Sequence, residues 1–211
     1  MRRQEFQVED EREIESFLAE ASFGVLATVR PDGSPSATPL NFAYHNGAVY
    51  FHGSRVGEKM ASLAEDNRVA FSVAREYAVI PSYFLDPALA CPATSYFKSV
   101  LMTGRAEIVT DLREKAEALE AMMRKLQPEG GYDPIRADDE RYAPQLKAVA
   151  VVKLVPEAAA AKFKFGQNLK EAKRAAVLEG LAQRGKPLDE ATRRLMMQYC
   201  PHAQTGGDHA D

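Results

Sequence analysis

A chain of 211 residues with 45% hydrophobic content is long enough to bury one sizeable core, with room for an appendage. Its net charge of −3 does not indicate a nucleic-acid or membrane-surface binder, and no apolar run approaches the roughly 20 residues of a membrane span. The segment from Met1 to Glu5 becomes acidic at once and lacks the apolar core of a signal peptide, so a cytoplasmic protein is expected. Cys91 and Cys200 lie far apart and are expected to stay reduced and unpaired.

The first part of the chain predicts one helix followed by short antiparallel strands. Asp10 can cap the helix, with Glu13 three residues later. A Pro-Asp-Gly turn and an Asn-Gly hairpin signal separate three strands, expected at 24–29, 36–44 and 49–52. Pro39 would break an inner ladder, so it predicts a sheet edge or a bulge.

The middle of the chain alternates strands, helices and two irregular segments. The pattern predicts a helix at 58–66, a strand at 68–74, an irregular segment at 77–97, a strand at 99–109, a helix from the cap Asp111 to about 125, and a loop at 127–145. A nearly all-apolar strand at 148–155 is expected to be central in the sheet.

Beyond Pro156 the pattern changes, with helices expected at 170–183 and 189–199. Short strands joined by hairpins predict an α+β fold: a small antiparallel β-barrel with flanking helices and a C-terminal helical extension. We expect a barrel domain at 1–157, a helical extension packing on it at 158–200, and a disordered tail at 201–211.

The stretch from Tyr50 to Lys59 is the strongest candidate for a binding site. A strand ends there, a polar Gly-rich turn follows, and a helix begins. The turn collects freed backbone N–H groups, the His52 ring, the Ser54 hydroxyl and the cations of Arg55 and Lys59, which together suit a phosphate or another small anion. The spacing is not that of a P-loop.

Several blocks of the sequence, in this order and spacing, resemble one known family. The blocks are 24–29, 32–33, 39–42, 46–47, 50–54 and 57–59, and they are similar to the pyridoxamine 5′-phosphate oxidase-like FMN-binding split barrels. The strand end Tyr-Phe-His-Gly-Ser and the helix start Gly-Glu-Lys look most like the nitroimidazole-resistance (Nim-type) branch, as do residues 76–81 and 96–106. Residues 162–181 resemble the C-terminal signature of flavin-nucleotide-binding proteins and PaiB-type regulators.

The resemblance implies an FMN-binding homodimer with two equivalent sites at the subunit interface. Lys59 would contact the FMN phosphate, and His52, Gly53 and Ser54 would line the same end of the site. Other positions carried over are Thr38, Pro39, Leu40 and Asn41 beside the flavin ring, Lys98 and Ser99 reaching the cofactor from the partner subunit, and Lys164, Gln167 and Asn168 closing over the site.

Two departures from the family pattern matter. True pyridoxamine phosphate oxidases end in a Trp- and Arg-containing substrate signature, and this chain has no Trp, so that activity is not expected. Those enzymes also place an Arg beside the phosphate-binding Lys, where this chain has Glu58. We expect Glu58 to point away from the phosphate and Arg55 to supply the missing charge.

Each candidate also has a plain structural interpretation. Lys59 could be a solvated lysine on a short helix, and His52 a sheet-end histidine bonded to a carbonyl. The aromatic residues Tyr83, Phe84, Tyr96 and Phe97 either cover a flavin or pack the long loop. Cys91, Cys200 and His202 lack the paired spacing of a zinc site.

The tail from Lys162 to Arg194 holds nine basic and four acidic residues, a local charge of +5. Without a helix-turn-helix pattern or aromatic interleaving, a solvated face or a lid over an anionic cofactor is favoured over contact with nucleic acid.

The leading hypothesis is a cytoplasmic FMN-dependent oxidoreductase that acts on a small organic acceptor, with nitroaromatic reduction as one example, using a reduced nicotinamide donor. FMN is preferred over FAD because the turn accommodates a single phosphate. The alternatives are a non-catalytic flavin-binding regulator or carrier, and a split barrel that holds haem or a deazaflavin.

Overall fold

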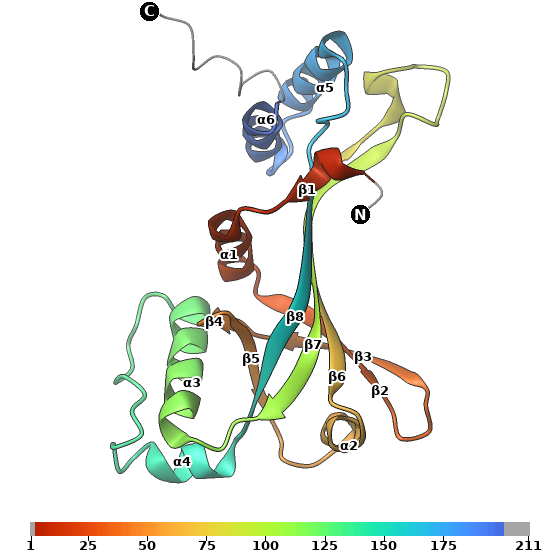
Figure 1. Ribbon diagram of the computed structural model, residues 1–211. Coiled ribbons are helices and arrows are strands. Elements are labelled where there is room, and N and C mark those ends of the chain that lie inside the picture. Colours follow the sequence, from red (N-terminus) through yellow and green to blue (C-terminus); the bar gives the residue numbers. More distant parts are fainter. Residues whose placement is uncertain (1–2, 201–211) are drawn as a thin grey trace, which may run out of the picture. The chain divides into compact units, whose positions relative to one another are not determined.

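The computed structural model describes residues 3–200, and the predicted tail and His202 lie outside the described residues. Within these residues the fold is α+β, as predicted: eight strands form one antiparallel sheet, accompanied by six α-helices (Figure 1). None of the described helices is long and apolar enough to span a membrane.

The strands are β1 (Gln7–Val8), β2 (Phe23–Val29), β3 (Pro35–Asn41), β4 (Ala43–His45), β5 (Ala48–Gly53), β6 (Arg68–Ile80), β7 (Thr94–Ile108) and β8 (Ala150–Lys164). The α-helices are α1 (Glu11–Glu20), α2 (Glu58–Glu65), α3 (Leu112–Leu126), α4 (Ala143–Ala148), α5 (Glu171–Arg184) and α6 (Asp189–Gln198), and two short 3₁₀ helices span Gln4–Phe6 (η1) and Ser82–Phe84 (η2).

The strand order is β3-β2-β6-β7-β8-β5-β4, with β1 pairing beside β8. The prediction that Pro39 marks a sheet edge is confirmed, because β3 is the terminal strand of this order. The expectation of a central strand after residue 148 is also confirmed, because β8 lies between β7 and β5.

Three strands extend further than their sequence pattern predicts. β6 continues to Ile80, β7 begins at Thr94 inside the segment expected to be irregular, and β8 passes through Pro156. The pairing of β5 with β8 ends at Leu154, so the missing N–H of Pro156 costs no bond to β5. The helix α4 also begins inside the expected loop, with Pro144 in its first turn, where a missing N–H is tolerated.

The chain divides into two compact units, each made from separate stretches of sequence. Within the described residues, unit 1 comprises 3–9, 74–99 and 161–200, and unit 2 comprises 10–73 and 100–160. The strands β6, β7 and β8 contribute residues to both units.

The core of unit 2 forms around the aromatic pair Phe42 and Phe71, whose rings meet edge-to-face at 5.0 Å. A Cβ at Gly24 would lie 2.2 Å from the Phe71 ring, so β2 accommodates this aromatic ring only because it carries a glycine there. Val49 and Phe51 of β5 are buried on one face of this strand. On its other face, Ala48 and Tyr50 pack against α3 in a second apolar cluster. Unit 2 therefore buries both faces of β5.

The core of unit 1 forms around Phe165, which follows β8. Its ring stacks on Tyr199 at 5.5 Å and meets the edges of Tyr77 and Tyr96. Arg184 at the end of α5 forms a two-point ion pair with the buried Asp189 of α6, at 2.9 and 2.6 Å. These contacts fix the two C-terminal helices within unit 1.

Candidate functional site

The candidate site in unit 2 lies where β5 ends and α2 begins. The Nζ atom of Lys59 lies 5.0 Å from the centroid of the Phe51 ring. A Cβ at Gly53 would lie only 3.3 Å from the same Nζ atom. Lys59 therefore folds back over the strand end, into space that a glycine leaves open.

The Lys59 ammonium is half-buried and has no carboxylate partner among residues 3–200. Burial lowers the pKa of Lys59 below its ordinary value of 10.5. A half-buried cation without a counter-charge is costly, and an anion bound beside it would remove that cost.

The N-terminus of α2 adds backbone donors to the same turn. Gly57 is the N-cap, with φ 116°, and no side chain caps the helix. The Ser54 hydroxyl accepts the Val56 N–H at 3.2 Å, within the turn, so it does not cap the helix. The first N–H groups of α2 are thus left for water or for an anion.

Glu58, the residue that departs from the family pattern, pairs with the β2–β3 region. Its Oε1 atom accepts from Arg30 Nε at 2.7 Å and from the Ser36 hydroxyl at 3.2 Å. Arg55, expected to supply charge to the site, donates from Nη1 to the carbonyl of Lys147 at 3.2 Å. Glu58 is tolerated next to Lys59 in the sequence because Arg30 neutralises its charge.

The structure does not bring the His52 side chain beside Lys59. Side chains alternate along a strand, so His52 shares a face with Tyr50, whereas Phe51 and Gly53 share the face of Lys59. His52 instead lines a pocket of about 510 Å³ with residues of α3 and α4, mostly apolar, including Leu119, Met122, Met123, Leu126 and Leu146.

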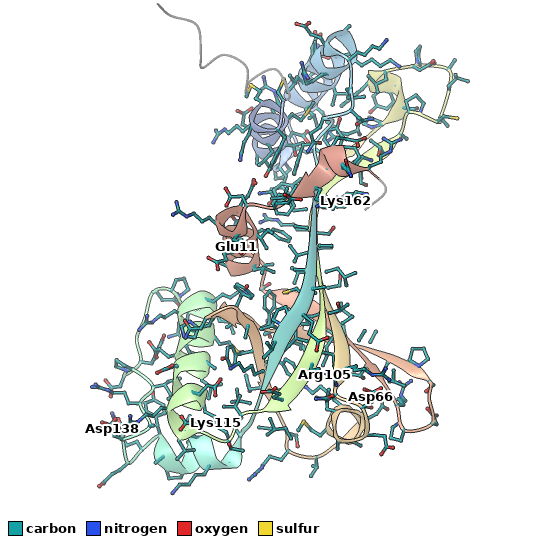
Figure 2. The ribbon with its side chains drawn as sticks, viewed as in Figure 1. Glu11, Asp66, Arg105, Lys115, Asp138 and Lys162 are labelled. Carbon is teal, nitrogen blue, oxygen red and sulfur yellow. The ribbon has the colours of Figure 1, made fainter. Side chains whose placement is uncertain are left out.

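Lys115 holds the two helices of this pocket together. It donates from α3 to the carbonyls of Leu146 at 3.0 Å and Val149 at 2.8 Å, and is labelled in Figure 2. Sequence reasoning missed the pocket because α4 lies in a polar, Pro-containing segment. The signal that could have found it is the run of apolar residues in α3 together with Leu146 and Val149.

The four β3 residues divide between the two faces of the sheet. Thr38 and Leu40 pair with Leu26 and Gly24, on the face that buries Leu26. Pro39 pairs with Val25 on the opposite face, as Asn41 does with Phe23. The Asn41 amide also donates to the carbonyl of Ser22 at 2.9 Å, which holds the end of β3 against the start of β2.

The remaining predicted residues belong to unit 1. Lys98 is buried, with Nζ 4.7 Å from the Phe163 ring centroid, and the Ser99 hydroxyl donates to the Lys162 carbonyl at 3.5 Å. Gln167 bonds within its own loop, donating to the Phe163 carbonyl at 2.6 Å. Their predicted contact with a cofactor stays a prediction.

The aromatic candidates of the long segment are packed within unit 1 to different degrees. Phe84 contacts Gly180 of α5, Tyr96 is buried against Phe165, and Tyr83 is exposed. No cluster of metal-ligating side chains occurs among the described residues, and Cys91 and Cys200 are free thiols.

Comparison with known proteins agrees with the fold and the order of the motifs. The family model of pyridoxamine 5′-phosphate oxidase matches residues 10–163, and the chain therefore belongs to that family. This confirms the family resemblance read from the sequence. No curated protein sequence matches the chain.

Solved structures share the fold at low sequence identity. A proposed 5-nitroimidazole antibiotic resistance protein from Bacteroides thetaiotaomicron is 24% identical, with a TM-score of 0.58, over 74% of this chain and 85% of that one. The flavocytochrome Anf3 from Azotobacter vinelandii is 24% identical (TM-score 0.64; 81% and 75% covered). An FAD and heme binding protein from Mycobacterium smegmatis is 21% identical (TM-score 0.63; 81% and 78% covered).

Proposed function

We propose that this protein binds FMN and acts as a flavin-dependent oxidoreductase on a small organic acceptor. Family membership supports a flavin, and two solved structures of the same fold are a flavocytochrome and an FAD and heme binding protein. Bound FMN supplies the hydride and electron transfer, and the protein supplies binding, orientation and electrostatics.

The observation that carries the proposal is the half-buried Lys59 ammonium beside the uncapped N-terminus of α2. Lys59, the first N–H groups of α2 and the Ser54 hydroxyl would hold one phosphate group. Gly53 leaves room for the Lys59 ammonium beside the strand. One phosphate-sized turn favours FMN over FAD. Nitroaromatic compounds are one acceptor class that the Nim-type resemblance suggests.

The test begins with the visible spectrum of the purified protein and the identification of any released cofactor. FMN titrated into cofactor-free protein should bind saturably. Anaerobic NADH or NADPH should bleach the bound flavin, and a nitro compound should restore its colour. Binding without bleaching would support a non-catalytic carrier or regulator, and failure to bind FMN would overturn the flavin proposal.

We further propose that the protein forms a homodimer through the outer face of β2 and β3 in unit 2. The apolar side chains Phe23, Val25 and Val29 are 57%, 38% and 39% exposed on one face of β2. Their cross-strand partners on β3 include Pro39 and Pro35. A row of exposed apolar residues on one face of a sheet favours association with another protein surface.

Val25→Glu tests this interface, because a charge at its centre should shift the protein to monomer in light scattering. Leu89→Glu, at an exposed apolar residue of unit 1, is the matched control and should leave the oligomeric state unchanged. A monomeric wild-type protein, or a Val25→Glu dimer, would overturn the proposed interface. If subunits share the cofactor site, monomerisation should also weaken FMN binding.

A second candidate function is haem binding, which the His52 pocket favours. One imidazole beside an apolar pocket of about 510 Å³ offers an axial ligand and an apolar enclosure. A Soret band that His52→Ala abolishes and Lys59→Met leaves intact would establish haem in place of flavin.

A further inference from the structure

A second pocket, in unit 1, is lined by Lys164 and Asn168, which the family resemblance places over the cofactor, and by polar groups that the proposed phosphate site does not include. It has a volume of about 450 Å³. Its polar lining includes Arg3, Lys164, Lys173 and the phenol ring of Tyr96, and its apolar lining includes Ile80 and Leu169. None of the described residues that line it carries a carboxylate. The pocket therefore combines cations and hydrogen-bond donors with an apolar wall.

Tyr96 is the most deeply buried polar residue of this pocket. The residue is 1% exposed, and its hydroxyl makes no hydrogen bond to a described residue. This oxygen is not among the fully enclosed atoms that lack a partner, so it is open to the pocket. Burial raises the pKa of Tyr96 to about 12, so the hydroxyl remains a neutral donor at physiological pH. A Cβ at Gly166 would meet the hydroxyl oxygen, so the space beside this oxygen exists because residue 166 is a glycine. A donor that opens into the pocket and has no partner in the protein is left for water or for a ligand to accept from.

Lys164 supplies a cation without a carboxylate partner. Its ammonium donates to the Thr94 hydroxyl, and no carboxylate among residues 3–200 pairs with it. Burial lowers the pKa of Lys164, and the charges of Lys162 and Arg3 lower it further. The positive charges of Lys162 and Arg3 disfavour the ammonium form of Lys164, and a bound anion would stabilise that form.

The other two cations are partly balanced. Arg3 lies 3.7 Å from Glu5. The Asp86 carboxylate accepts the N–H groups of Ala88 and Leu89, which lower its pKa, and the charge of Lys173 lowers this pKa further. Lys164 is therefore the pocket cation that most needs an external partner.

We propose that this pocket binds a small organic anion. Its carboxylate or phosphate accepts hydrogen bonds from the Tyr96 hydroxyl and the Lys164 ammonium, and its apolar body lies against Ile80 and Leu169. All the residues that line it belong to unit 1, and the Lys59 phosphate site shares none of them.

Calorimetric titration with benzoate and phenyl phosphate, and with neutral benzamide as the control ligand, tests the proposal. We expect saturable binding of at least one anion and none of benzamide. The stronger of the two anions identifies whether carboxylate or phosphate is the preferred head group. Saturation by neither anion, or equal binding of benzamide, would overturn the proposal.

Three variants assign the binding to this pocket. Tyr96→Phe and Lys164→Met should each weaken the preferred anion at least tenfold, and Lys186→Met, at an exposed lysine outside the pocket, should leave it unchanged. The Tyr96 hydroxyl has no internal partner, so the phenylalanine variant keeps the packing. Loss of binding in Lys59→Met alone would assign the anion to the α2 turn and refute this site.

Alkylation of the two free thiols gives an independent measurement. Cys91 is exposed and lines the pocket, whereas Cys200 does not line it. The bound anion should slow the reaction of Cys91 with the neutral reagent N-ethylmaleimide and leave the Cys200 rate unchanged, as followed by peptide mass spectrometry. An unchanged Cys91 rate at saturating anion would contradict the proposal.

Discussion

Replacing Lys59 with methionine tests the phosphate site most directly. Methionine keeps an apolar stem against the Phe51 ring and removes the charge. Loss of a charge-assisted contact costs about 1.5 to 3 kcal/mol, so the Kd for FMN should rise about 10- to 150-fold. No internal carboxylate loses a partner, so the melting temperature of the cofactor-free protein should not fall.

Quenching of FMN fluorescence measures this affinity, and Lys147→Met, at an exposed lysine of unit 2, is the control. The pH dependence provides a second readout. Burial lowers the pKa of Lys59 in the free protein, and the phosphate needs the ammonium form. Wild-type affinity should therefore fall as pH rises through that lowered pKa, while the affinity of the methionine variant should lack this fall. An unchanged Kd in Lys59→Met would refute the phosphate site.

Two further predictions concern stability. Gly104→Ala would place a Cβ 2.1 Å from the Val155 carbonyl oxygen. Urea unfolding should show that the free energy of unfolding falls by about 2 kcal/mol or more, against less than about 1 kcal/mol for the control Thr103→Ala. Equal losses in the two variants would contradict the close approach of β7 and β8. Burial lowers the pKa of Lys125 to about 8, so between there and 10.5 the unfolded chain binds more protons and the free energy of unfolding should rise with pH. The rise should be about 1 to 2 kcal/mol after screening of this half-buried group, and Lys125→Met should abolish it; the same pH profile in both proteins would show that Lys125 is not responsible.

The sequence predicted best those features that local chemistry determines. Asp10 and Asp111 each accept two backbone N–H groups at the start of α1 and α3, as capping residues should. Asn46 and Gly47 both have positive φ, 49° and 75°, and form the two-residue hairpin between β4 and β5. These elements need no information from distant parts of the chain.

The strand lengths could not be predicted in the same way, because distant partners determine them. β8 is paired by β5 as far as Leu154, and by β1 at Ala161 and Lys162, and every one of these partners lies 97 or more residues earlier in the chain. Pro156 lies between these two pairings, and in the local sequence it predicts a strand end. The pairing with β1 carries β8 past it.

The candidate site was predictable in part. The glycine, the lysine and the helix start at the α2 turn follow from local sequence, and the structure brings Lys59 over Gly53. The face of His52 follows from strand alternation, which separates it from Phe51 and Gly53. The pocket that His52 lines could not be predicted, because it depends on α4 folding within a polar segment and packing on α3.

The three strands shared by the two units have a consequence for shortening the chain. Removing everything after residue 157 would end β8 about halfway along its length, leave β1 without its partner, and delete Phe163 and Phe165 from a core that also contains Tyr77 and Tyr96. The C-terminal region is thus not a removable appendage.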